Sequence, residues 1–252
     1  IIGKVRRIPV IVHFIEEEAW QRAVQSRTNQ KPLGDFYKDP DKPFKIKAIL
    51  KVQSFVLKKA DAVITPSSFL NILISQQYNL TSEKVYTNHL PAPEEQTLPF
   101  EQNRKPYRIT TLTELFDWKG VEYILEALAV LKKELSDVEL ELMGTGPQEE
   151  TLKEKARSLN IEKSVYFAGS VSKAEEWYRI KNSEVFVFTP LQEKEPPEQI
   201  LMAFKVETPV VASNVAGITE IVEDEISSLL TPTAKSEKIA KAIKNVLEVK
   251  TN

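Results

Sequence analysis

Apolar runs of strand length alternate with helical patterns along most of the 252 residues. Runs of four to seven apolar or β-branched residues indicate buried strands, whereas apolar residues at three- and four-residue spacing indicate helices. The expected strands lie in residues 8–14, 61–66, 84–90, 107–113, 138–144, 165–170, 185–190, 209–214 and 228–232. Strands that alternate with helices through short connections predict parallel sheets covered on both faces.

The helical spacing is clearest between the expected strands of the second half. Residues 121–135 place six apolar side chains along one face of a helix. These are Val121, Ile124, Leu125, Leu128, Leu131 and Leu135. Residues 16–25 and 45–59 and the segment around Ile239 to Leu247 also predict helices. The sequence therefore predicts an α/β protein.

One segment breaks the alternation. Residues 91–106, "PAPEEQTLPFEQNRKP", contain four prolines and mixed charges, which is typical of a linker. We therefore expect two lobes, residues 1–98 and residues 99–252. The first contains fewer βα units than a complete doubly wound domain, so we expect it to be incomplete.

Composition excludes several classes of protein. The net charge of −2 gives no reason to expect a nucleic-acid partner. There is no cysteine and there are only two histidines, which excludes disulfides, thiolate metal sites and histidine-rich clusters. We expect no cofactor or metal and a cytoplasmic location, with peripheral attachment to a membrane as the alternative.

The turn "LTELFDWKG" (112–120) offers the most specific chemistry. Lys119 and Gly120 join a strand to the helix that starts near Val121. A helix N-terminus has free N–H groups and a positive partial charge, so it can hold a phosphate, and a neighbouring lysine adds a cation. The alternative is a solvated lysine beside a turn glycine, and the local sequence alone favours it.

Two further strand-end loops carry candidate site residues. Gly144 and Gly146 lie in a strand-end turn that could cradle phosphate, and Pro147 is expected at the first helical position. The segment "EKEPPEQ" (193–199) brings carboxylates that could bind sugar hydroxyls, although a plain charged loop is the alternative. His13 is expected to be a buried, hydrogen-bonded histidine rather than a catalytic one.

The second half resembles the C-terminal domain of the retaining glycosyltransferases of family 4, which have the GT-B fold of two Rossmann-type lobes. The resemblance rests on three stretches in the same order. They are "LTELFDWKGVEYILEALAVL", "VELELMGTGPQEETLKEKARSLNIEKSVYFAGSVSKAEEWYRIKNSEVFVFTPLQE" and "ETPVVASNVAGITEIVEDEISSLLTP". The first half is similar to the later part of the family's acceptor lobe.

The resemblance implies that the C-terminal lobe binds a nucleotide sugar, such as a UDP- or GDP-sugar. Lys119 would then bind the donor diphosphate, Gly169, Ser170 and Val171 would face the base, and the loop from Glu193 to Gln199 would face the sugar. The implied donor-binding residues are Thr113, Lys119, Gly144, Gly146, Gly169, Ser170, Val171, Glu193, Glu195 and Gln199. No residue is assigned to catalysis.

The sequence also departs from the family's motifs. Thr113 and Glu114 replace a Gly-Arg pair whose arginine is the second diphosphate ligand. The family's two glutamates, eight positions apart, fall on Lys194 and Met202, or after a one-residue shift on Glu195 and Ala203. Glu207 stands where the family has a glycine.

Both ends look short beside the family. The first strands of the acceptor lobe and the C-terminal helix that crosses back to it are missing. We therefore expect a divergent, truncated member whose first lobe is completed by a second chain or by self-association.

The favoured function is transfer of a sugar from a nucleotide sugar to an unknown acceptor with retention, in a cleft between the lobes. A degraded relative that binds a nucleotide, a glycan or a partner without turnover is the first alternative. A GT-B nucleotide-sugar epimerase is the second, and it would need catalytic acids and histidines that the sequence does not place.

Overall fold

The computed structural model describes residues 8–15, 17–26, 33–89, 91–96, 105–224 and 228–249. The chain divides into two compact units, residues 1–90 with 194–196 and residues 91–193 with 197–252. The expected lobe boundary between residues 98 and 99 lies outside the described residues.

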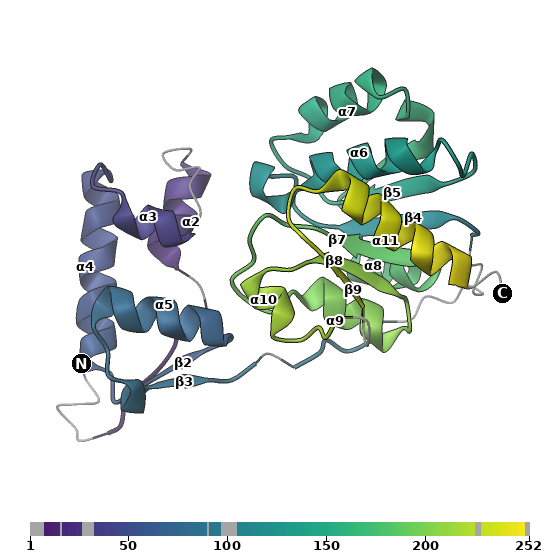
Figure 1. The fold of residues 1–252 in the computed structure, drawn as a ribbon. Helices are drawn as coiled ribbons and strands as arrows, with labels where there is room; N and C mark the ends of the chain where they lie inside the picture. Colours follow the sequence, from purple (N-terminus) through teal and green to yellow (C-terminus); the bar gives the residue numbers. More distant parts are fainter. Residues whose placement is uncertain are drawn as a thin grey trace. The chain divides into compact units, whose positions relative to one another are not determined.

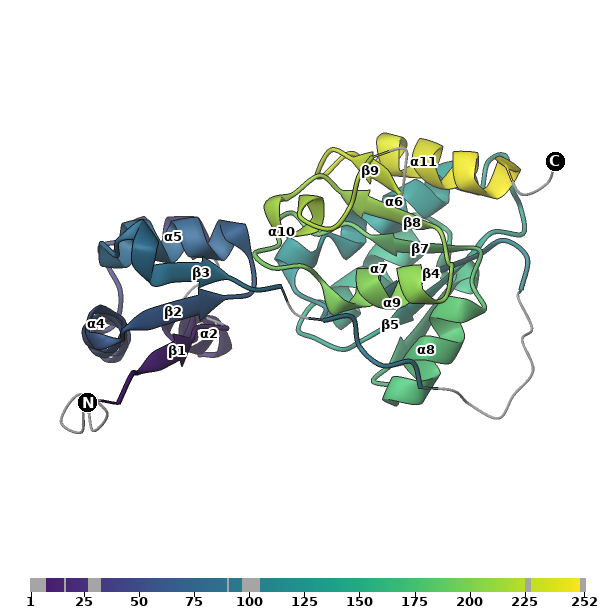
Figure 2. The ribbon, with the colours of Figure 1, turned by 90° about the horizontal axis from the view of Figure 1, so that it is seen from below.

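The first unit contains a three-stranded parallel sheet in the order β1-β2-β3 (Figure 2). Its strands are β1 (Ile11–His13), β2 (Ala62–Thr65) and β3 (Val85–Thr87). Its helices are α2 (Glu18–Gln25), α3 (Leu33–Lys38), α4 (Phe44–Lys59) and α5 (Ser68–Tyr78), and the 3₁₀ turn η1 (Ser82–Lys84) precedes β3. Helix α3 was not expected, because prolines surround it in the sequence.

His13 is exposed, so the expectation of a buried histidine is wrong. Strand alternation places His13 on the same face of β1 as Ile11, which is 62% exposed. The register aligns His13 with Ile64 and Ile64 with Tyr86, and Tyr86 is also 55% exposed. This face of the small sheet is therefore open, and the apolar neighbours in the sequence do not bury the histidine.

A buried carboxylate links helices α2, α3 and α5 of the first unit. Glu17 is fully buried at the N-cap of α2 and accepts hydrogen bonds from the Tyr37 and Tyr78 hydroxyls. Burial, reinforced by the nearby Glu17 charge, raises the pKa of both tyrosines well above the usual range, so both remain protonated donors. The two hydroxyls satisfy a charge that would otherwise be costly to bury.

The second unit contains a six-stranded sheet in the order β6-β5-β4-β7-β8-β9, with every neighbouring pair parallel. Its strands are β4 (Arg108–Leu112), β5 (Glu139–Met143), β6 (Val165–Gly169), β7 (Val185–Phe188), β8 (Val210–Ser213) and β9 (Leu229–Thr231). Its α-helices are α6 (Val121–Leu131), α7 (Glu149–Ser158), α8 (Lys173–Lys181), α9 (Glu198–Lys205), α10 (Ala216–Thr219) and α11 (Ser236–Val249). The 3₁₀ turns η2 (Asp117–Lys119) and η3 (Glu162–Ser164) precede α6 and β6.

Helices cover both faces of this sheet (Figure 1). One apolar cluster joins α6, α7 and α11 to side chains such as Leu140 and Val187. The other joins α8 and α9 to side chains such as Met143 and Phe186. The alternation along each strand sends successive residues to the two clusters, so the expected α/β class with parallel sheets is confirmed.

The start of α7 differs from the sequence expectation. Pro147 is not the first helical residue, because α7 begins at Glu149 with Gln148 as its N-cap. The turn is held instead by hydrogen bonds from the Gln148 amide to the Leu115 carbonyl and from the Leu115 amide to the Thr145 carbonyl, each 3.0 Å long. Helix α7 therefore begins two residues after the expected first helical residue, Pro147.

Glu207 occupies a position that normally requires glycine. Its φ is 57° at the C-terminal end of α9, where its amide donates to Phe204 O and the Thr208 amide donates to Ala203 O. This pair of bonds is the Schellman arrangement, which places a left-handed residue just after the helix. Glu207 therefore has the left-handed backbone conformation that glycine adopts most easily, although it carries a Cβ.

We expect Glu207→Gly to stabilise the chain by about 1 kcal/mol, because a residue with a Cβ is strained at positive φ. Urea denaturation of the wild type and the variant measures this. Glu207→Ala is the matched control, since it removes the carboxylate but keeps the Cβ. An equal gain in the alanine variant would show that charge, and not backbone strain, is responsible.

A second stabilising contact links three helices through one carboxylate. Glu126 on α6 accepts from Lys155 Nζ on α7 at 2.6 Å and from Ser236 Oγ at the start of α11, also at 2.6 Å. These two hydrogen bonds, with the Lys155 bond the stronger influence, lower the pKa of Glu126. The ionised form is therefore the one that the folded chain favours.

We expect Glu126→Gln to lower the free energy of unfolding at pH 7 by about 1 kcal/mol or less, since the group is partly exposed. A lowered carboxyl pKa contributes stability above its unfolded value of about 4.3, and that stability is lost as the pH falls through the folded value. The difference from the wild type should thus begin to shrink below about pH 4 and vanish once the pH is below the folded value. Denaturation curves at several pH values test this, with Glu154→Gln on α7 as the control. A difference that persists unchanged at low pH would contradict it.

Candidate functional site

The order of the six strands reverses direction at β4 in the second unit. The chain moves outward from β4 through β5 to β6, then returns to place β7 on the other side of β4. Loops that follow β4 and β7 therefore diverge to opposite faces at their carboxyl ends. Ligands of open α/β sheets bind at this reversal.

The loops after β4 and β7 lie close together at this edge. Gly120 has a φ of 66°, and a Cβ there would clash with the Thr189 carbonyl oxygen. The Leu191 amide donates to the Trp118 carbonyl at 2.8 Å, which joins the loops a second time. Glycine is thus needed at position 120 both for its conformation and for the close approach.

Lys119 and Glu193 meet between these loops. Lys119 Nζ lies 2.9 Å from Glu193 Oε2, with side-chain exposures of 17% and 11%. The ammonium also lies 5.8 Å from the centre of the Phe188 ring at the end of β7. The Glu193 carbonyl accepts from the Gly217 amide at 3.0 Å, so α10 helps to position the carboxylate. The lysine is therefore not a freely solvated side chain.

The loops after β5 and β6 reach the same edge from the other side of β4. The Thr113 amide donates to Met143 O at 3.0 Å and the Gly144 amide to Gly169 O at 2.8 Å. Gly144 has a φ of 124°, and a Cβ there would clash with Thr113 O. Thr113, Gly144, Gly146 and Gly169 therefore lie in consecutive loops on the edge that also carries Lys119.

Three buried hydroxyls lie at the ends of adjacent strands. Thr113, Thr189 and Ser213 follow or end β4, β7 and β8 and are 6%, 2% and 0% exposed. None of their side-chain oxygens has a hydrogen-bond partner within the part of the chain that the structure describes. Only Thr113 was named from the sequence. The signal for the other two was a small hydroxyl residue directly after an apolar run, in "FVFT" and "VVAS".

The remaining expected site residues can be placed by the elements that carry them. Ser170 and Val171 follow β6 directly, and Gln199 lies in the first turn of α9. Glu195 belongs to the 194–196 stretch that groups with the first unit, where Lys194 lies 5.0 Å from the Trp20 ring centre.

Glu114 and Met202, two positions at which the sequence departs from the family's motifs, have different surroundings in the structure. Glu114 is exposed just after β4, on the edge that carries Lys119. Met202 is fully buried on α9 in the apolar cluster with Phe186 and Trp177. A carboxylate at position 202 would have to be buried among apolar side chains, so the methionine is part of the core.

Among the described residues, no group of three or more histidine, aspartate or glutamate side chains could hold a metal ion. No helix in the described segments is both long enough and apolar enough to cross a membrane.

Solved structures with a similar fold were found. Anabaena HepE in complex with UDP-glucose superimposes with a TM-score of 0.74 at 18% identity, over 99% of this chain and 65% of that protein. Sucrose-phosphate synthase from Thermosynechococcus elongatus gives 0.68 at 20% identity, over 98% of this chain and 66% of that protein. The expected GT-B-like fold class, with Rossmann-type units and parallel sheets, is thereby confirmed.

Relatives were also found by sequence. An uncharacterized glycosyltransferase of Haemophilus influenzae is 29% identical over 185 residues, 71% of this chain and 52% of that protein. The alpha-monoglucosyldiacylglycerol synthase of Streptococcus pneumoniae is 27% identical over 187 residues, 69% of this chain and 42% of that protein. The chain thus spans about half the length of these relatives.

The family described as Glycosyl transferases group 1 matches residues 94–251. This region contains the whole six-stranded sheet and every loop of the candidate site. Since the match covers more than half of the chain, the protein belongs to the glycosyl transferases group 1 family.

Proposed function

We propose that this protein, as part of a glycosyltransferase, binds a nucleotide-sugar donor at the carboxyl edge of the six-stranded sheet and transfers the sugar to an acceptor. The observation that carries the proposal is the Lys119–Glu193 pair at the strand-order reversal of a group 1 family member. The Lys119 cation can pair with the diphosphate of such a donor, and the Glu193 carboxylate beside it can accept hydrogen bonds from the sugar.

The chemistry assigns separate tasks to the two residues. Lys119 would bind the diphosphate and stabilise the charge that develops on it as the glycosidic bond breaks. Glu193, once released from Lys119, would accept hydrogen bonds from the sugar hydroxyls. The buried hydroxyls of Thr113, Thr189 and Ser213 add neutral donors at the floor of the same edge. Catalysis would come mainly from positioning and charge stabilisation, with no cofactor or metal required.

The family and the similar structures support a nucleotide sugar as the donor class. HepE was solved with UDP and with UDP-glucose, so a UDP-sugar is the first donor to test and a GDP-sugar the second.

We further propose retention of the anomeric configuration, as in family 4. Proton NMR of donor hydrolysis or transfer tests this, because the first product formed from an α-linked donor should be the α-anomer. An initial β-anomer would contradict retention.

A second function is favoured by specific residues. Glu114 adds an exposed negative charge at the diphosphate edge, and Met202 leaves no carboxylate at the second motif position. Both changes fit a protein that binds a nucleotide or a glycan without turnover. Nucleotide binding without hydrolysis or transfer from any UDP- or GDP-sugar would favour this function over the enzyme.

We expect Lys119→Ala to weaken UDP binding by about tenfold to a hundredfold, the value of one charge-assisted hydrogen bond. Glu193→Gln should instead tighten UDP binding, since the diphosphate would no longer compete with a carboxylate for Lys119. Titration calorimetry measures both. Lys133→Ala and Glu154→Gln, on exposed residues of α6's C-terminal turn and α7, are the controls. Unchanged affinity in Lys119→Ala would place the nucleotide elsewhere.

We also expect Glu114→Arg to tighten UDP binding by about tenfold or more, because a repelling anion becomes a second phosphate ligand. Calorimetry at two salt concentrations tests this, and the gain should shrink at high salt. Glu114→Gln is the matched control and should show a smaller gain. Equal or weaker binding in Glu114→Arg would mean that the diphosphate does not approach the end of β4.

A further inference from the structure

Helix α4 of the first unit presents apolar side chains to solvent. Ten large apolar side chains of the described residues are exposed, and nine of them lie in the first unit. Four of the nine are on α4, where Phe44, Val52, Phe55 and Val56 are 84%, 62%, 49% and 40% exposed. Single exposed apolar residues are normal, but a group of them on one helix usually marks an interaction surface.

The spacing of these side chains gathers them on one face of the helix. The apolar stripe of α4 consists of Phe44, Ala48, Val52 and Phe55. Successive members are four, four and three residues apart, which is the spacing of one helical face, and all four are exposed. Ile46 and Leu57, on the opposite face, are 5% and 1% exposed. The apolar stripe therefore faces away from the core of the first unit.

The position of α4 within the first unit agrees with this assignment. Helix α4 lies at the margin of the unit, with α2, α3 and α5 all to one side of it in both views (Figures 1 and 2). The contacts of α4 with other helices are made with α2 and α5. One side of α4 is thus packed against protein, and the side with the apolar stripe is open.

Lysines flank the apolar stripe. Helix α4 contains five lysines and no acidic residue, in a chain whose net charge is −2. Lys47, Lys51 and Lys58 lie along one margin of the stripe, and Lys45 and Lys59 lie toward the other. All five are exposed, and within the described residues none of them forms an ion pair. The outer face of α4 is therefore both apolar and strongly positive.

This combination favours a membrane surface over a protein partner. Lysine is depleted at protein–protein interfaces, and a protein that covered the stripe would have to supply carboxylates for several unpaired ammonium groups. An anionic bilayer offers phosphate headgroups to the lysines on both margins. At the same time, the apolar stripe can enter the boundary between the headgroups and the acyl chains.

The length and charge of α4 suit a helix that lies on a membrane. It has 16 residues, five of them lysine, whereas a spanning helix needs about 20 consecutive, mostly apolar residues. The long lysine side chains can run along the apolar stripe and keep their ammonium groups in the headgroup layer. Basic residues on one face and aromatic residues on the other are typical of helices in the membrane interface.

We propose that the outer face of α4 binds the surface of an anionic membrane. Phe44, Val52 and Phe55 insert at the headgroup boundary, and the lysines of α4 pair with the lipid phosphates. Peripheral attachment to a membrane, which was the alternative location expected from the sequence, thereby gains a defined surface. The proposal does not depend on sugar transfer, because lipid binding requires neither a donor nor an acceptor.

Sedimentation of the full chain with lipid vesicles tests the proposal. The wild type should bind vesicles of equal parts phosphatidylcholine and phosphatidylglycerol, and it should not bind measurably to phosphatidylcholine alone. Phe44→Ser should weaken binding to the mixed vesicles by about tenfold and Lys51→Gln by about fivefold. Lys51→Arg keeps the charge and should bind like the wild type. Both side chains are exposed, so the melting temperature should not change.

Matched control variants lie in the second unit. Tyr166→Ser removes the exposed aromatic side chain of β6, and Lys241→Gln removes an exposed lysine of α11. Neither should change vesicle binding. The proposal is overturned if the wild type does not bind the mixed vesicles, binds both kinds equally, or keeps its affinity in Phe44→Ser and Lys51→Gln. A dimer in light scattering that Phe44→Ser converts to a monomer, without vesicle binding, would assign the apolar stripe to a second copy of the chain instead.

Discussion

The close approach of the β4 and β7 loops is the constraint on which the site depends. Parallel strands bring all their carboxyl ends to one edge, and the loops after β4 and β7 meet there. Gly120 permits this contact, because only a residue without a Cβ can lie against the Thr189 carbonyl at a φ of 66°. Lys119 is then carried to within 2.9 Å of Glu193, although the two residues are 74 positions apart in the chain.

The alternation of apolar and polar residues was enough to predict the class of fold. Each strand of the second unit is a short apolar run whose successive side chains join two opposite clusters. The strands could therefore be located from the sequence. The first unit was harder, since α3 follows a proline and His13 looks buried among apolar neighbours. Its exposure follows from the open face of a three-stranded sheet, and no local pattern contains that information.

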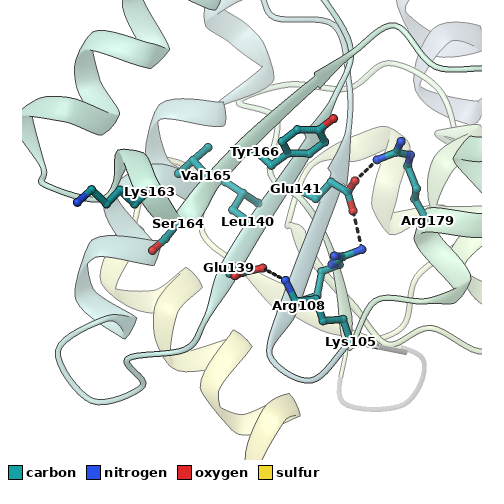
Figure 3. Close-up of a pocket in the computed structure, with 10 residues that line it drawn as sticks. All are labelled: Lys105, Arg108, Glu139, Leu140, Glu141, Lys163, Ser164, Val165, Tyr166 and Arg179. Atoms are coloured by element: carbon teal, nitrogen blue, oxygen red, sulfur yellow. Dashed lines mark hydrogen bonds and ion pairs between the residues drawn. The ribbon is translucent and has the colours of Figure 1, made fainter. Parts of the chain in front are cut away.

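The site was predictable in part for a similar reason. Strand-end loops could be located from the sequence, so Lys119 and Glu193 were both candidates before the structure placed them together. Their pairing could not be foreseen, because it depends on the position of β7 beside β4 and on the Gly217 amide that positions Glu193. A polar cavity lined by Arg108, Glu139, Glu141 and Arg179 was not predicted from the sequence (Figure 3). These residues lie on two strands and one helix, and each looks like an ordinary surface charge in the sequence.

The positions at which the sequence departs from the family's motifs differ in their structural roles. Glu207 has a positive φ although it carries a Cβ, so the fold tolerates a strained residue at the end of α9. At Met202 the side chain has become part of the core, which makes a simple return to a carboxylate costly. Glu114, by contrast, is exposed, so burial in the core does not explain its charge. Under the proposed function, this charge at the end of β4 would lie on the edge that binds the diphosphate.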